Sequence, residues 1–171
     1  MNIFIVKKQR AATLAIGLII LFVMTLIGTT ALQTTALEEK ITANLNDTNL
    51  AMESADSALR DAERRIEALT NTSTFGRSGG LYTQGNAPDP FAASTWTGSN
   101  SFTATAIPGV VTPRYFIEEV GTYGGGTDIN VYNYGQDPRG GSVTVFRIVS
   151  RGTGGTGTAD VMLESFYGKQ F

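Results

Sequence analysis

The chain has 171 residues, enough for one compact domain with an extension. It contains no cysteine and no histidine, which excludes disulfides, thiolate or imidazole metal sites, and catalytic triads that need a histidine base. The formal net charge is −2, so no global positive field favours a nucleic acid as the main partner. We therefore expect a protein that is not an enzyme and that holds no metal and no cofactor.

An uncharged segment, residues 11–37, follows a short leader that carries Lys7, Lys8 and Arg10. Its most apolar part, residues 11–32, would extend about 33 Å as a helix, enough to cross a hydrocarbon core of roughly 30 Å. Cations before the segment and acids after it predict a cytoplasmic N-terminus. The residues alone leave two alternatives open, a retained single-pass anchor and a cleaved secretory signal.

A periodic stripe of small and apolar side chains continues beyond the uncharged segment. No proline occurs before Pro88, and the stripe recurs every three or four positions, as on one face of a helix. We expect one continuous helix over residues 11–69, whose second half covers a downstream domain; a dimeric coiled coil is the alternative. The side chains predicted for this helix-on-sheet core are Leu37, Ile41, Leu45, Met52, Leu59 and Ile66.

Two pairs of opposite charges are spaced for ion pairs on this helix. Asp56 precedes Arg60, and Asp61 precedes Arg65, each by four positions. This order places the acid one turn before the base, which stabilises a helix by a few tenths of a kcal/mol, about 0.2–0.5 per pair.

Beyond residue 70 the chain becomes rich in glycine and in small polar residues. Residues 71–113 are predicted to form an irregular connection, and strand-like segments separated by glycines follow at 114–120, about 130–134, 142–151 and 159–167. The expected fold class is α+β, with a three- or four-stranded antiparallel sheet packed on a long helix. The side chains expected to hold the connection to the core are Phe75, Leu81, Tyr82, Phe91 and Trp96.

Two motifs imitate ligand sites. The glycines of residues 152–157 match GxGxxG, but a strand follows them instead of the helix that a dinucleotide site needs, so we interpret them as a hairpin loop. Asp128, Asn130 and Asp137 could offer oxygen ligands to calcium, but their order does not fit an EF-hand loop. We expect them to form a solvated turn.

The string Gln-Arg-Ala-Ala-Thr-Leu at residues 9–14 resembles the type III signal of type IV prepilins. The resemblance implies cleavage between Ala11 and Ala12 by a prepilin peptidase, N-methylation of the new terminus, and retention of the apolar helix. Ala11 stands where the family has glycine, and its small size is compatible with cleavage. The residues that would pack against other pilin helices in a filament are Thr13, Leu14, Ile16, Leu18, Ile19 and Phe22.

The fifth residue of the predicted mature chain is Ile16, where pilins usually carry glutamate. In the filament that glutamate is thought to meet the terminal amine of the subunit above it. Because a buried carboxylate without a partner is costly, a subunit with none above it is better served by an apolar side chain. This departure indicates a place at the filament tip, early in assembly.

Four further segments resemble the PilX family of minor pilins: residues 37–45, 49–60, 113–119 and 146–155. The resemblance implies a pilin-like fold and a minor pilin that primes assembly at or near the pilus tip. The implied partners are the prepilin peptidase, other minor pilins, the major pilin and, before assembly, the inner membrane. The alternatives are a tip pseudopilin of type II secretion, and a tip adhesin or DNA-uptake module that uses residues 71–112.

This interpretation divides the chain by role. Residues 1–11 are the expected leader, 12–36 the membrane and filament-core half of the helix, 37–70 its amphipathic half, and 71–171 a periplasmic globular domain with its sheet in 114–171. We expect a single-pass inner-membrane protein that later becomes part of an extracellular pilus.

Overall fold

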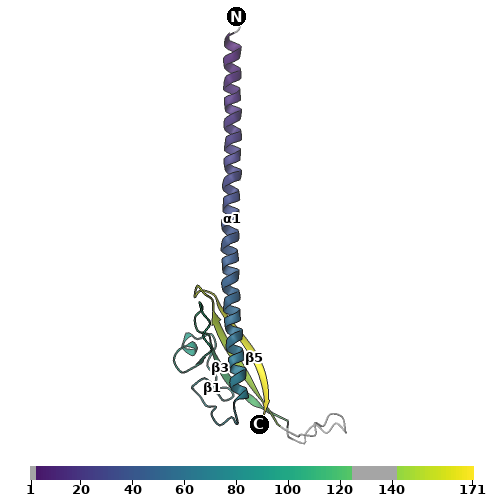
Figure 1. Cartoon of the computed structure of the whole chain (residues 1–171), viewed down its shortest axis with the longest axis vertical. Helices are drawn as coiled ribbons and strands as arrows, with labels where there is room; N and C mark the ends of the chain where they lie inside the picture. Colours follow the sequence, from purple (N-terminus) through teal and green to yellow (C-terminus); the bar gives the residue numbers. More distant parts are fainter. Residues whose placement is uncertain (1–2, 125–141) are drawn as a thin grey trace, which may run out of the picture. The chain divides into compact units, whose positions relative to one another are not determined.

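The computed structural model of the chain describes residues 3–124 and 142–171, with side chains from Ala12 onward. The chain divides into two compact units, Met1–Leu45 and Asn46–Phe171, and each is described by itself. One helix, α1 (Ile3–Glu67), contributes to both units (Figure 1). It begins eight residues earlier than predicted, because the leader contains no proline or glycine, and it ends two residues earlier.

In the first unit, residues 12–37 of α1 carry no charged side chain and are mainly apolar around the whole circumference. Its threonine hydroxyls donate hydrogen bonds to backbone carbonyls three or four residues earlier, for example from Thr25 to Phe22 at 2.7 Å and from Thr34 to Thr30 at 3.0 Å. These bonds satisfy hydroxyl groups that would otherwise be costly to remove from water. By length and composition, α1 contains a segment that could cross a membrane.

In the second unit, α1 lies against a five-stranded sheet in the order β1–β3–β4–β5, with β2 also paired to β3 (Figure 1). The long strands β3 (Arg114–Tyr123), β4 (Val143–Thr153) and β5 (Asp160–Gln170) are antiparallel neighbours. The strand β2 (Phe102–Thr103) is antiparallel to β3, whereas β1 (Leu81–Tyr82) is parallel to it. The sheet is therefore mixed and has five strands, not the three or four antiparallel strands expected.

The predicted strands at 114–120, 142–151 and 159–167 correspond to β3, β4 and β5, and the one near 130–134 lies outside the described residues. The segment 71–113 is more ordered than predicted, because it supplies β1, β2 and the 3₁₀ helix η1 (Ala93–Trp96). Of its expected anchors, Phe91 is 82% exposed, so that prediction was wrong. The other anchors, which are buried, are Phe75, Leu81, Tyr82 and Trp96.

The face of α1 that covers the sheet is built from small side chains. Of the predicted core residues, Ile66 is buried and Leu59 is half-buried. Leu59 packs against the main hydrophobic cluster, which consists of Ala58, Ala62, Ile66, Phe75, Leu81, Tyr115, Ile117, Phe146 and Ile148. The prediction was wrong for four others, each more than half exposed: Leu37, Ile41, Leu45 and Met52. Besides Ile66 and Asp47, the buried residues of α1 are Ala51, Ser54, Ala55, Ala58 and Ala62.

The close approach of β4 explains this choice of small residues. A Cβ atom on Gly152 would lie 2.9 Å from the Ala55 Cα, and closer still to the Ala51 carbonyl oxygen and the Ala55 nitrogen. At this separation the sheet meets the helix backbone directly, so no large side chain fits between them. Further along α1 the gap is filled by larger side chains of the main cluster, including Ile66, Phe146 and Ile148.

Alternate residues of β3 and β4 point to the opposite face of the sheet. There Phe116 and Val149 form a second cluster with Tyr82 and Trp96. The Tyr82 and Trp96 rings lie 5.9 and 5.8 Å from the Phe116 ring, and the Trp96 indole N–H donates to the Pro90 carbonyl at 2.8 Å. The segment 71–113 is held to the sheet by this cluster, and Trp96 serves as the packing anchor that we expected.

Candidate functional site

The candidate assembly surface is the apolar part of α1 in the first unit. All six side chains predicted to pack in a filament are exposed, with Leu14 at 73%, Ile16 at 57% and Phe22 at 59%. Ala12 is exposed as well, and Ala11 lies in α1 with its side chain outside the described ones. A continuous surface of this kind is stable in a lipid bilayer or against other apolar helices, where each large side chain contributes about 1.5–3 kcal/mol on burial.

Within the second unit, polar contacts join α1 to the sheet and its loops, and the first of them along the helix is made by Asp47. This carboxylate is buried on the helix and accepts hydrogen bonds from the Thr156 hydroxyl at 2.5 Å and the Thr156 backbone N–H at 2.9 Å. These bonds lower the pKa of Asp47, because they stabilise its charged form. Asp47 thus connects the loop between β4 and β5 to the helix through hydrogen bonds.

This contact explains the GxGxxG motif. The Gly154 N–H donates to the Ala159 carbonyl at 2.8 Å, and Gly157 adopts a φ of 78°, so the motif closes the β4–β5 hairpin. A Cβ atom on Gly154 would lie 2.6 Å from the Asp47 carboxyl carbon. The motif serves helix packing and turn formation, as the hairpin interpretation expected.

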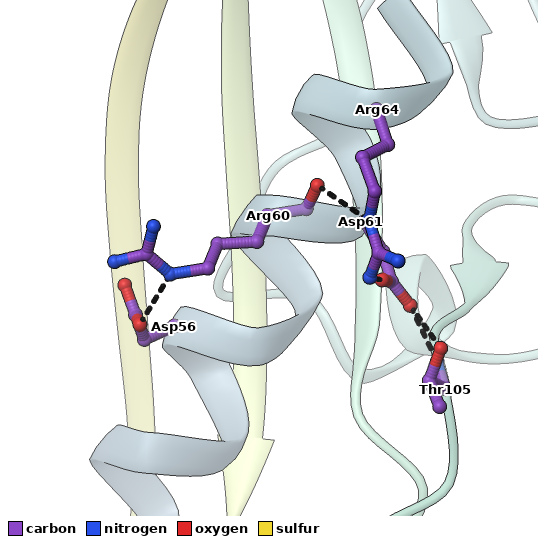
Figure 2. A network of polar contacts seen from close by, with 5 residues as sticks. All are labelled: Asp56, Arg60, Asp61, Arg64 and Thr105. Atoms are coloured by element: carbon purple, nitrogen blue, oxygen red, sulfur yellow. Dashed lines mark hydrogen bonds and ion pairs between the residues drawn. The ribbon is translucent and has the colours of Figure 1, made fainter.

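Ion pairs on α1 differ partly from those predicted. Asp56 and Arg60 form the expected pair at 3.0 Å, but Asp61 pairs with Arg64, not with Arg65 (Figure 2). Asp61 also accepts hydrogen bonds from the Thr105 N–H at 2.6 Å and the Thr105 hydroxyl at 2.8 Å (Figure 2). Burial alone would raise the pKa of Asp61, but these bonds and the Arg64 charge outweigh burial and lower it.

The other residue of the second predicted pair, Arg65, stacks on an aromatic ring. Its guanidinium carbon lies 3.7 Å from the centre of the Phe102 ring on β2. Such cation–π contacts contribute about 0.5–1 kcal/mol at exposed sites, more than a single ion pair on a helix surface. The short strand β2 thereby gains a contact to α1 that the helix sequence by itself could not indicate.

Across the sheet, charged side chains form a ladder. Arg147 on β4 lies 3.0 Å from Glu118 on β3 and 3.1 Å from Glu164 on β5. Hydrogen bonding to Glu164 raises the pKa of Arg147, burial opposes this, and the bond to Glu118 adds to the increase. The ladder joins the three long strands on the face opposite α1, and its charges are already paired.

None of these groups has the geometry of a metal centre. Within the described part of the chain, no three acidic, histidine or cysteine side chains are grouped so that they could hold a metal ion. The calcium candidates Asp128, Asn130 and Asp137 lie outside that part. The first unit offers an exposed apolar helix surface, and the second unit is a small sheet domain whose charged groups are largely paired.

Two family models match the chain, one at each end. The model of the PilX N-terminal region matches residues 11–60, and that of the C-terminal region of the type IV pilus assembly protein PilX matches residues 65–169. Comparison with curated proteins and with solved structures gave no match. The two models cover both the apolar helix and the sheet domain, and the chain therefore belongs to the PilX family of type IV pilus minor pilins.

Proposed function

We propose that this minor pilin primes pilus assembly and occupies a position at or near the filament tip. The observation that carries the proposal is the apolar side chain of Ile16, the fifth residue after the proposed cleavage site. A carboxylate there would need a partner from the subunit above, and an unpartnered charge among apolar helices costs several kcal/mol, of order 2.5–3.5 even by insertion scales. A subunit that starts a filament has no such partner.

The exposed helix surface supports a membrane-held precursor that later joins a helical bundle. The proposed route begins with an inner-membrane protein whose N-terminus is cytoplasmic and whose second unit is periplasmic. A prepilin peptidase cleaves between Ala11 and Ala12, and the helix then packs against those of other minor pilins and the major pilin. Thr13, Leu14 and Ile16 would make the first of these contacts, and no catalytic or cofactor-dependent step is required of this chain.

The processing step is tested by measuring the intact mass of the protein extracted from membranes of its native host. We expect the mass of residues 12–171 with one added methyl group. A mass that starts at Met1 would show that Ala11 prevents cleavage, and one that starts at Leu37 would indicate a secreted soluble domain. Either of these would contradict the proposed processing.

The tip position is tested by placing an acid at residue 16. We expect Ile16→Glu to reduce the number of piliated cells severely, because the new carboxylate has no amine above it, whereas Ile16→Leu should leave piliation unchanged. Labelling of the second unit in sheared pili should locate the protein at filament ends. Normal piliation by the glutamate variant, or labelling along the whole filament, would refute the tip position.

The family match favours a pilus over a type II secretion pseudopilus. Deletion of the gene in the native host separates the two systems. Loss of pili or of twitching motility with normal protein secretion is the expected outcome, and the reverse pattern would assign the protein to secretion.

A further inference from the structure

A small polar pocket lies in the second unit, on the sheet face opposite α1. It has a volume of about 160 Å³. We call it the arginine pocket, and it is lined by Trp96, Val111, Thr112, Arg114, Arg151 and Thr153.

The two arginines of the pocket are direct cross-strand neighbours. Arg114 on β3 is the Cα partner of Arg151 on β4. Like charges directly opposite each other destabilise a sheet, in contrast to the alternating charges of the ladder formed by Glu118, Arg147 and Glu164. The two positive charges repel each other in the free protein, and an anion bound between the two guanidinium groups would relieve this repulsion.

Among the described residues, an acid neutralises only one of the two charges. Arg151 forms an ion pair with Asp160 at 2.6 Å. Arg114 is half-buried, and its hydrogen bonds go to neutral acceptors, the Ser101 hydroxyl at 2.8 Å, the Gly98 carbonyl at 2.7 Å and the Ser101 carbonyl. Among the described residues no acid pairs with Arg114, so the pocket keeps one net positive charge.

The pocket also keeps hydrogen-bond donors. In the part of the chain that the structure describes, neither the Nη1 group of Arg114 nor the Nε and Nη1 groups of Arg151 donates to another residue. Thr112 and Thr153 line the same space, and the Thr153 hydroxyl donates to Asp160 at 2.7 Å. Each unused guanidinium N–H can donate a charge-assisted hydrogen bond to a carboxylate oxygen.

We propose that the arginine pocket binds the carboxylate group of a ligand. A single negative charge balances the one unpaired positive charge, whereas a dianion such as phosphate would meet the neighbouring carboxylate of Asp160. The volume admits one functional group and not a whole drug-sized molecule, for which pockets of about 300–1,000 Å³ are usual. Trp96 is 7% exposed, so it forms a wall and leaves no ring face on which a sugar could stack.

The inference does not depend on the pilus tip proposal, because it rests on the second unit alone. The carboxylate could belong to an acidic side chain or to an acidic sugar. Acetate and glucuronate separate these sources, since acetate supplies the carboxylate alone and glucuronate supplies it on a sugar ring.

Trp96 is the only tryptophan of the chain, so its fluorescence reports directly on the pocket. The Arg151 guanidinium carbon lies 6.0 Å from the centre of its ring. We would titrate the full-length protein in detergent micelles with acetate, glucuronate and inorganic phosphate at constant ionic strength and about pH 8.5, where phosphate is almost entirely a dianion. Saturable fluorescence changes with acetate and glucuronate, and a change at least about tenfold weaker with phosphate, are expected.

Three variants make the titration specific. Arg151→Gln should abolish saturation, since it removes the guanidinium donors and leaves Asp160 without its cationic partner. Asp160→Asn should bind carboxylates more tightly and should also admit phosphate, a gain that a misfolded protein cannot show. Arg60→Gln removes an arginine from an ion pair outside the pocket and should titrate like the unchanged protein.

Two results would overturn the proposal. One is a fluorescence change that sodium chloride reproduces at the same ionic strength, and the other is unchanged binding by Arg151→Gln. Saturation by glucuronate and not by acetate would show that the sugar ring contributes, and equal affinity for both would assign recognition to the carboxylate.

Discussion

Gly152 determines how closely β4 approaches α1. A methyl group at this position would overlap the backbone of Ala51 and Ala55, which cannot move aside as a flexible side chain can. We expect Gly152→Ala to lower the free energy of unfolding of the second unit by about 2–3 kcal/mol, as overpacking does elsewhere. Urea unfolding followed by Trp96 fluorescence measures this loss.

Gly76 provides the matched control for that substitution. A Cβ atom there would meet no other atom within 4 Å, and Gly76 does not have a positive φ. Gly76→Ala should therefore change stability by less than about 0.5 kcal/mol. If both alanine variants unfold at the same urea concentration, the helix and sheet are not in contact at Gly152.

Ser54 lies in the same interface and is fully buried, and its hydroxyl has no hydrogen-bond partner among the described residues. Because an unsatisfied buried polar group costs about 1–3 kcal/mol, we expect Ser54→Ala to stabilise the second unit by about 1 kcal/mol. Thermal unfolding followed by circular dichroism tests this expectation, with Ser57→Ala on the same helix as the control. A destabilised alanine variant would show that the hydroxyl is hydrogen-bonded in solution.

The C-terminal end of α1 is capped by a side chain from β5. The Lys169 ammonium donates hydrogen bonds to the carbonyls of Ile66 at 2.9 Å, Glu67 at 2.5 Å and Leu69 at 2.7 Å. The last carbonyls of a helix have no partners within it and carry partial negative charge, so a cation here both donates hydrogen bonds and matches the helix dipole.

We expect Lys169→Met to destabilise the second unit by about 1–2 kcal/mol, because the apolar stem remains while the cap is lost. Hydrogen exchange should show faster opening of the last turn of α1. Lys40→Met, at an exposed position in the first unit, is the control. Unchanged exchange at the helix end would mean that solvent replaces the ammonium without loss.

The elements differ in how far they could be predicted. The long strands have many β-branched and aromatic residues, and β4 buries apolar side chains on both of its faces, as is typical of a central strand. The strands β1 and β2 have two residues each, too short for any periodic pattern, and they exist only because β3 offers its edge. The hairpin loop was predicted, but its attachment to Asp47 was not, since the two lie 109 residues apart.

Several carboxylates of the second unit are stabilised in the charged form. Hydrogen bonds from Thr156 lower the pKa of Asp47, and the bond from Arg151 lowers that of Asp160. The pKa of Asp61 is lowered too. A carboxylate with a lowered pKa contributes stability above its unfolded pKa of about 3.9, and that stability is lost as the pH falls through the folded value.

We therefore expect the urea midpoint of the second unit to stay nearly constant from about pH 7 to 5 and to fall below about pH 4. Asp47→Asn should be less stable than the unchanged protein at pH 7 and should lose less on acidification. An acid profile identical in both proteins would show that Asp47 contributes nothing to the pH dependence.

The sequence alone predicted the apolar helix, the three long strands and the family, because these depend on local composition, periodicity and motifs. It pointed to the stripe of Leu37, Ile41, Leu45 and Met52 as the core, since large apolar residues at helical spacing usually face inward. Only the tertiary structure showed that small residues face the sheet, because this depends on how closely Gly152 approaches the helix. The arginine pocket is likewise a product of register: Arg114 and Arg151 are ordinary surface charges until β3 and β4 pair and place them opposite each other.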